Sequence, residues 1–159
     1  MSDVPIHPEG VASGKRVSRT LLAVALAGLA AFVVLRGQLT PLSEWPADFQ
    51  QAQRNAVDAQ KPLLIQFSSS GCPYCVRMDR EVLTTEAVGA LLADFELVRI
   101  DAWQEDALAG RYGIEGIPAF VVLGPQGQFV GKVEGYQPAD RFTAFLRRAA
   151  GALSRVSVR

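Results

Sequence analysis

The residues best suited to chemistry are Cys72 and Cys75, the two cysteines of this 159-residue chain. An apolar segment precedes the pair and helical spacing follows it, so a strand-to-helix turn is expected here. Pro73 suits the first helical position, where a missing N–H is no loss. Unpaired N–H groups and the helix dipole at that end stabilise a thiolate, the attacking species. We therefore predict Cys72 as the nucleophile and Cys75, one turn further and more buried, as the resolving thiol.

Three other uses of the cysteine pair stay open on the residues alone. Half of a zinc site needs further cysteines or histidines, and the one histidine, His7, lies in a polar N-terminal stretch. Copper(I) is a soft ion that two thiolates and Met78 could hold. A permanent structural disulfide would constrain the unfolded chain little, because the loop it closes is short. A C-x-x-C pair beside a βαβ pattern favours a redox dithiol, which needs no metal and no cofactor beyond its own disulfide.

Hydrophobic spacing shows which elements must position the pair. Helical stretches are predicted from Trp45-Pro46 to about Gln60, after Cys75, from a cap at Thr84 or Thr85 through Leu92, over 105–112 and over 138–153. Strands are predicted over 63–67, 95–100, 119–123 and 128–134, the last two joined as a hairpin by Gly124-Pro125-Gln126-Gly127. The order requires a parallel crossover and then antiparallel strands, so we expect an α/β fold with a mixed central sheet flanked by helices.

Two separated motifs resemble the thioredoxin superfamily. The first is Gly71-Cys72-Pro73-Tyr74-Cys75 after a hydrophobic strand, and the second is the stretch RYGIEGIP that ends at Pro118, close to the thioredoxin signature YGIxGIP. The resemblance covers about residues 45–150 and implies a thioredoxin-like fold. It also implies that Pro73 and Tyr74 form the active-site turn, that Pro118 is cis and lies against the disulfide, and that the Ile117 backbone pairs with the substrate chain.

The chain departs from the thioredoxin pattern around the first motif. Gln66 stands six residues before the first cysteine, where thioredoxin has a buried aspartate, and an amide cannot accept a proton from the resolving thiol. Asp101 and Glu115 are the candidates for that base. Gly71 replaces the thioredoxin tryptophan and leaves this side of Cys72 more open. The sequence flanking the motif looks more like exported thioredoxin-like domains, such as the C-terminal domain of the DsbD transporter and its single-domain relatives.

Three aromatic residues lie near the predicted element ends. Tyr74 is expected to be exposed between the cysteines. Trp45 is expected to pack on the domain. Trp103, which follows the second strand, is expected to pack at its loop and not to contact a substrate.

The N-terminal part contains sixteen uncharged residues, 20–35, between Arg19 and Arg36. As a helix this run is about 24 Å long, slightly less than a hydrocarbon core of about 30 Å. Basic residues precede it, so the positive-inside rule places the N-terminus in the cytoplasm. We predict a cytoplasmic tail (1–19), a transmembrane signal anchor (20–36), a linker (37–44), a thioredoxin-like domain (45–153) and a C-terminal tail (154–159). A cleaved signal peptide, leaving a soluble periplasmic domain, is the alternative.

Charge and composition narrow the class of function. The chain has 16 basic and 16 acidic residues and 49% hydrophobic residues, so neither a dedicated nucleic-acid binder nor a wholly disordered chain is expected. The sequence predicts a single-pass protein of the inner membrane, held in the bilayer by residues 20–36, that reduces protein disulfides in the periplasm. Its electrons would come from a membrane donor such as a DsbD-like transporter. A non-catalytic thioredoxin-like adaptor or copper(I)-binding module is the alternative.

Overall fold

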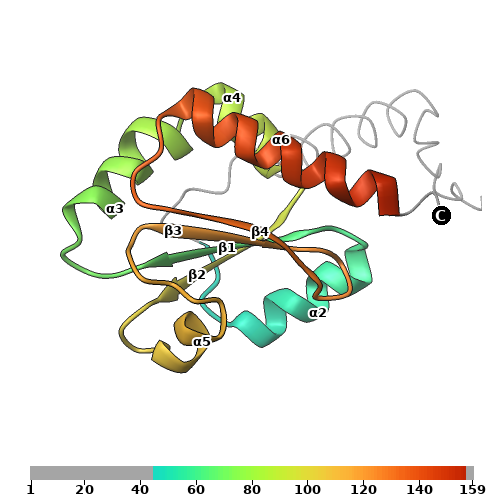
Figure 1. Cartoon of the computed structure of the whole chain (residues 1–159), viewed down its shortest axis with the longest axis horizontal. Coiled ribbons are helices and arrows are strands. Elements are labelled where there is room, and N and C mark those ends of the chain that lie inside the picture. The colour runs from blue at the N-terminus through green and yellow to red at the C-terminus, as the bar shows by residue number, and fades with distance from the viewer. Residues whose placement is uncertain (1–44, 157–159) are drawn as a thin grey trace, which may run out of the picture. The chain divides into compact units, whose positions relative to one another are not determined.

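The computed structural model describes residues 45–156, with side chains as far as Leu153 (Figure 1). Its helices are α2 (Phe49–Ala59), α3 (Pro73–Met78), α4 (Glu86–Leu92), α5 (Asp106–Arg111) and α6 (Ala139–Val156), and a π-helical segment, η2 (Asp79–Leu83), continues α3. Its strands are β1 (Leu63–Ser68), β2 (Glu96–Asp101), β3 (Ala119–Leu123) and β4 (Phe129–Glu134). Each helix and strand predicted for residues 45–153 is therefore present.

The strands form one mixed sheet in the order β2-β1-β3-β4. β1 and β2 are parallel, with Ser68 opposite Asp101, whereas β3 runs antiparallel to both β1 and β4. Figure 1 shows α3, α4 and α6 on one face of the sheet and α2 and α5 on the other. The predicted α/β class with a mixed, helix-flanked sheet is confirmed.

Two hydrophobic layers hold the helices to the sheet. Successive side chains of a strand point to opposite faces, and β1 and β3 are buried along their whole length because helices cover both faces. One layer centres on Phe120 and Phe142, whose ring centroids lie 4.6 Å apart. The other contains Ile65 and Phe67 from β1. Trp45 is buried in the first layer, so the prediction that it packs on the domain is confirmed.

The carboxyl ends of β1 and β2 and the start of β3 meet at one edge of the sheet. The N–H of Ala102 donates to the carbonyl of Ser68 at 2.8 Å, so the loop after β2 begins beside the loop after β1. Phe67 lies opposite Ala119, which places the residues before β3 at the same edge. Three loops therefore converge there, and one of them carries the cysteine motif.

The structure differs from the sequence prediction in local details. Thr85 does precede α4, but its hydroxyl donates to the carbonyl of Val82, and that of Thr84 donates to the carbonyl of Arg80. Both hydroxyls therefore bond the end of η2 and do not cap α4. The last helix continues to Val156, past the end at 153 that its periodicity indicates.

Within residues 45–156, the structure contains no helix both long and apolar enough to cross a membrane. The transmembrane anchor predicted over 20–36 lies outside the described residues. So do the predicted tail over 1–19 and the linker over 37–44.

Candidate functional site

Cys72 and Cys75 form a disulfide at the start of α3, with their Cα atoms 5.3 Å apart. Cys72 is the N-cap of the helix, and its Sγ accepts the N–H of Cys75 at 3.1 Å. Pro73 occupies the first helical turn. Cys72 is partly exposed, whereas Cys75 is only 2% exposed. The geometry thus presents one sulfur to solvent and keeps the other beneath it, which suits an attacking and a resolving thiol.

The loop before β3 lies directly against this disulfide. The carbonyl oxygen of Ile117 is 4.0 Å from the Sγ of Cys72. The peptide bond between Ile117 and Pro118 is cis, Pro118 is buried, and its carbonyl accepts the N–H of Gly135 at 2.8 Å. The two sequence motifs, more than forty residues apart in the chain, therefore share one site.

Two side chains of β4 hold the segment that leads into this loop. One carboxylate oxygen of Glu134, Oε2, accepts the N–H groups of Glu115 at 3.0 Å and Gly116 at 2.9 Å. The other, Oε1, lies 2.8 Å from the Nζ of Lys132, which also donates to the carbonyl of Gly113. This pair was not predicted from the sequence. Its only local signal is two opposite charges spaced by two residues, which share a face of a strand.

Replacing Glu134 by glutamine is expected to lower the free energy of unfolding at neutral pH. The loss should be smaller in acid. The Lys132 contact, followed by the N–H groups of Glu115 and Gly116, holds the pKa of Glu134 below its ordinary value. In acid the unfolded chain then binds a proton before the folded chain does. The stabilisation is therefore complete above the ordinary glutamate pKa of about 4.3 and is lost as the pH falls through the lowered one.

The measurement for Glu134→Gln is the urea midpoint of wild type and variant from about pH 7 to pH 3. The difference between the two should shrink as the pH falls. Glu115→Gln removes a carboxylate from the same loop and is the charge-matched control. A difference that is constant over this range, or is equally large for the control, contradicts the assignment.

Gln66 is fully buried and lies in a polar network beneath the motif. Its amide donates to a carboxylate oxygen of Asp79 at 2.9 Å and accepts from the Nε of Arg99 at 3.1 Å. Arg99 and Asp79 are themselves paired at 3.0 Å. The amide therefore joins a carboxylate to a guanidinium at the position where thioredoxin carries its buried acid.

Asp79 is a further carboxylate close to the resolving cysteine. It was not among the residues predicted as the base for that thiol. Its N–H donates to the carbonyl of Cys75, so it follows the resolving cysteine by one helical turn. Of the two predicted candidates, Asp101 accepts the N–H groups of Trp103 and Gln104, and Glu115 is exposed. The helical spacing of Asp79 from Cys75 is the signal that could have identified it.

A further cluster ties the cysteine helix to the turn after β4. Glu81 accepts the hydroxyl of Tyr136 at 2.8 Å and pairs with Arg77 at 2.9 Å, and the Arg77 guanidinium lies 4.4 Å from the centre of the Tyr136 ring. The Tyr136 hydrogen bond, followed by that from Arg77, lowers the pKa of Glu81. Since the adjacent Gly135 binds Pro118, one turn contacts both halves of the site.

The exposed aromatic side chains near the motif are not all as predicted. Tyr74 is 61% exposed, as expected. Trp103 is 75% exposed, so the prediction that it packs at its loop is wrong. The carboxylate of Asp101 accepts the N–H of Trp103 at 2.9 Å and fixes a turn that leaves the indole in solvent.

Met78, a possible copper(I) ligand on the sequence alone, is fully buried in the first hydrophobic layer.

Among the described residues no cluster of three or more His, Cys, Asp and Glu side chains is placed to hold a metal ion.

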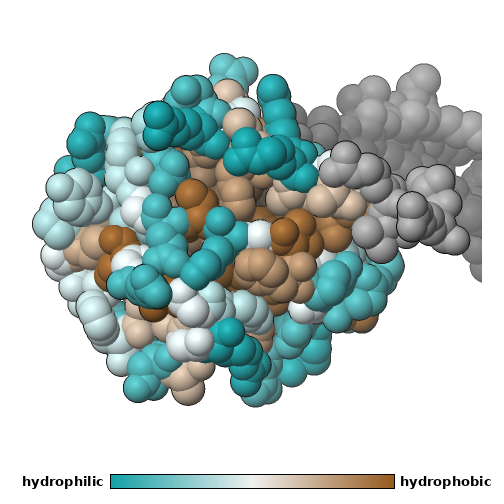
Figure 2. All heavy atoms as spheres, viewed as in Figure 1, coloured by the Kyte–Doolittle hydropathy of each residue, from teal (hydrophilic) through white to brown (hydrophobic). Residues whose placement is uncertain are grey.

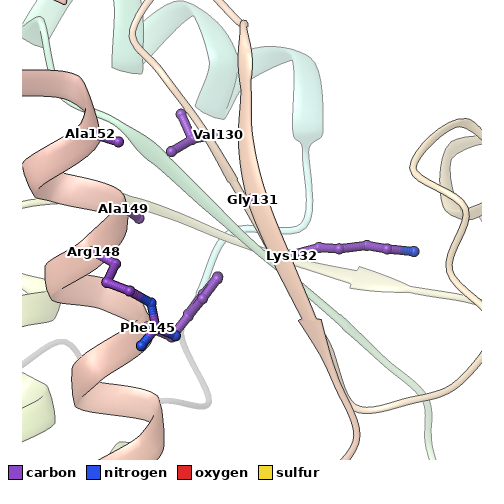
Figure 3. Close-up of a pocket in the computed structure, with 7 residues that line it drawn as sticks. All are labelled: Val130, Gly131, Lys132, Phe145, Arg148, Ala149 and Ala152. Carbon is purple, nitrogen blue, oxygen red and sulfur yellow. The ribbon is translucent and has the colours of Figure 1, made fainter.

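A pocket lies between α6 and β4, where apolar side chains also gather in Figure 2. It is lined by Val130, Gly131, Lys132, Phe145, Arg148, Ala149 and Ala152 (Figure 3). The side chain of Lys132 points away from α6 in Figure 3, in keeping with its bonds to the 113–116 loop. None of the predicted site residues lines this pocket.

Comparison with known proteins places this disulfide and loop in a family. A family model described as a thioredoxin-like domain matches residues 49–150. The chain belongs to this family. The predicted resemblance to the thioredoxin superfamily is thereby confirmed, and this thioredoxin-like domain contains a Cys72–Cys75 disulfide of the redox type.

Individual relatives agree with this thioredoxin-like assignment. The thiol:disulfide interchange protein DsbD of Ralstonia nicotianae is 32% identical over 148 residues, which cover 89% of this chain but only 24% of that protein. A thioredoxin from Thermus thermophilus superposes with a TM-score of 0.63 at 28% identity, over 71% of this chain and 90% of that one. The C-terminal domain of DsbD from Neisseria meningitidis, oxidised, has the same fold, with a TM-score of 0.57 at 22% identity over 66% of this chain and 98% of that one.

Proposed function

We propose that this chain is a membrane-tethered thiol–disulfide oxidoreductase that reduces protein disulfides in the periplasm. The observation that carries the proposal is the placement of a partly exposed Cys72 sulfur at the N-cap of α3, 4.0 Å from the Ile117 carbonyl, with Cys75 buried beside it. This arrangement gives an incoming disulfide access to one sulfur and reserves the other for the second step.

The reaction starts from the reduced pair. The Cys72 thiolate attacks one sulfur of the substrate disulfide, forms a mixed disulfide and releases the first substrate thiolate. Cys75 then attacks the Sγ of Cys72, which releases the second substrate thiolate and closes the Cys72–Cys75 disulfide. Two electrons pass from the pair to the substrate, and the protons of the two cysteines end on the substrate thiols.

The surrounding residues have supporting roles in this proposal. The Ile117 backbone pairs with the substrate chain beside the disulfide, and cis-Pro118 fixes that backbone against Cys72. Pro73 and Tyr74 form the turn between the cysteines. No metal or further cofactor takes part, since the disulfide itself carries the electrons.

The location and the electron donor are also part of the proposal. Residues 20–36 would anchor the chain in the inner membrane with residues 1–19 in the cytoplasm, and a DsbD-like transporter would return electrons to the disulfide. The uncharged run 20–35 with basic residues before it supports the anchor, and the similarity to DsbD proteins supports the donor. The chain spans about a quarter of the length of the DsbD relative described above.

A redox titration of the full chain in detergent tests this function. Equilibration in dithiol–disulfide buffers of defined potential should give a single two-electron transition between about −270 and −120 mV, the range from thioredoxin to DsbA. The oxidised fraction is read by thiol alkylation and mass. A pair that stays oxidised at every potential within this range is a structural disulfide, and a copper(I) complex that survives a competing chelator favours the carrier alternative. Either result contradicts the proposal.

A further inference from the structure

Trp103 is a large apolar side chain left in solvent at the edge of the sheet that carries the cysteine motif. It is 75% exposed, more than Tyr74 at 61% or Phe129 at 56%. Tryptophan is usually well buried. It is enriched at protein–protein contacts, where its ring supplies apolar area together with an N–H donor. Its exposure leaves the ring available for contact with another chain.

The position of Trp103 follows from the register of the two parallel strands. Ser68 at the end of β1 lies opposite Asp101 at the end of β2, and the Ala102 N–H binds the Ser68 carbonyl at 2.8 Å. Neighbouring strands are about 4.8 Å apart, and an extended chain covers about 3.3 Å per residue. A substrate segment that lies over the disulfide would therefore need only a few further residues to extend to the start of the Trp103 loop.

The order of the strands places Trp103 and Ile117 on opposite sides of Cys72. β1, which leads to Cys72, lies between β2 and β3. Trp103 follows β2, whereas Ile117 precedes β3. A substrate segment that reacts at Cys72 and touches the Ile117 backbone therefore has Trp103 on its other flank.

Gly71, the residue before Cys72, adds no side chain to the surface beside the motif. Apart from its two chain neighbours, no heavy atom lies within 4 Å of where its Cβ would be, and its φ of +86° suits glycine. The backbone that carries the indole is already fixed, because one oxygen of Asp101 accepts the N–H groups of Trp103 at 2.9 Å and Gln104 at 3.2 Å. A partner would therefore meet an ordered loop and would not have to order it.

We propose that Trp103 is a specificity-determining contact for protein substrates. It packs against an aromatic or large aliphatic side chain that lies a few residues from the reacting cysteine in an extended segment of the substrate. This inference rests on the proposed function, because the segment is held in place by reaction at Cys72. Small disulfides do not reach the indole and do not depend on it.

The test compares Trp103→Ala with Phe129→Ala in the reduced full chain. Phe129 pairs with Leu123, which lies opposite Leu63 at the start of β1, so this exposed aromatic stands at the other end of the sheet. The rate of oxidation is measured with a peptide disulfide that carries phenylalanine near one cysteine, with its serine analogue, and with hydroxyethyl disulfide.

Trp103→Ala should react about tenfold more slowly with the phenylalanine peptide, as expected if the indole is one of the few residues that carry most of the binding energy. Its rate with hydroxyethyl disulfide should be unchanged, and Phe129→Ala should match wild type throughout. Equal rates of wild type and Trp103→Ala with the phenylalanine peptide, or an equal loss with every disulfide, overturn the inference. Failure of the wild type to react even with hydroxyethyl disulfide instead overturns the proposed function, and this inference with it.

Fluorescence gives a readout that does not depend on rates. The chain has two tryptophans, so Trp45→Phe leaves Trp103 as the sole indole. In a Trp45→Phe/Cys75→Ser chain, a mixed disulfide with the phenylalanine peptide should shift the emission to shorter wavelength and reduce quenching by iodide. A mixed disulfide with mercaptoethanol should change neither. Emission that is the same in both adducts contradicts the contact.

Discussion

A Cys75→Ser variant is expected to accumulate a stable mixed disulfide with its substrate, whereas Cys72→Ser forms none and loses turnover. The reason is the division of exposure between the two sulfurs: Cys72 is accessible at the N-cap, and Cys75 is 2% exposed behind it. Without Cys75 the second displacement has no intramolecular nucleophile, so the intermediate persists. Non-reducing electrophoresis followed by mass spectrometry of the adduct measures both outcomes.

The double variant Cys72→Ser/Cys75→Ser is the control for nonspecific adducts in this experiment. An adduct on Cys72→Ser that is as abundant as the one on Cys75→Ser would contradict the assigned roles. The partner recovered from Cys75→Ser also identifies the substrate chemically. A periplasmic protein in that adduct supports the proposed location, and a cytoplasmic one contradicts it.

Phe120→Ala is expected to lower the free energy of unfolding strongly. Phe120 is fully buried on β3, two residues after Pro118, with its ring 4.6 Å from that of Phe142. Truncating such a phenylalanine removes its burial and leaves a cavity, at a cost of about 3–5 kcal/mol. Since small domains are stable by only about 5–15 kcal/mol, the variant should lose a large share of its free energy of unfolding.

Urea unfolding measures the effect of Phe120→Ala, with two variants for comparison. Phe129→Ala removes a ring that is 56% exposed and should change the free energy of unfolding by about 0.5 kcal/mol or less. Phe120→Leu keeps most of the apolar volume and should fall between the two. Similar midpoints for Phe120→Ala and Phe129→Ala would show that the layer around Phe142 is not tightly packed.

The elements and the two motifs could be predicted because their signals are local. The short apolar run before Cys72 predicts a buried strand from its own residues. Pro73 favours the start of a helix at the motif itself. The element order then left few ways to arrange a sheet, and the motif before Pro118 provided the family resemblance. None of these inferences required knowing which distant residues touch.

The contacts that hold the site could not be predicted, because they depend on strand register. Glu134 reaches Glu115 and Gly116 only through the pairing of β3 with β4, and Arg99 reaches Gln66 only through the pairing of β1 with β2. Residue type misled at one position. Trp103 was expected to be packed because indoles are usually buried, but the carboxylate two residues earlier in the chain determines its turn.

The end of β4 and the turn after it bind three parts of the site through three consecutive residues. Glu134 holds the 113–116 loop, Gly135 binds Pro118, and Tyr136 binds Glu81 next to the cysteine helix. Surface turns usually accept extra residues during evolution, because little depends on their length. Here one inserted residue would move at least one of the three contacts out of position. The length of this turn is therefore constrained by the chemistry of a disulfide that lies elsewhere in the chain.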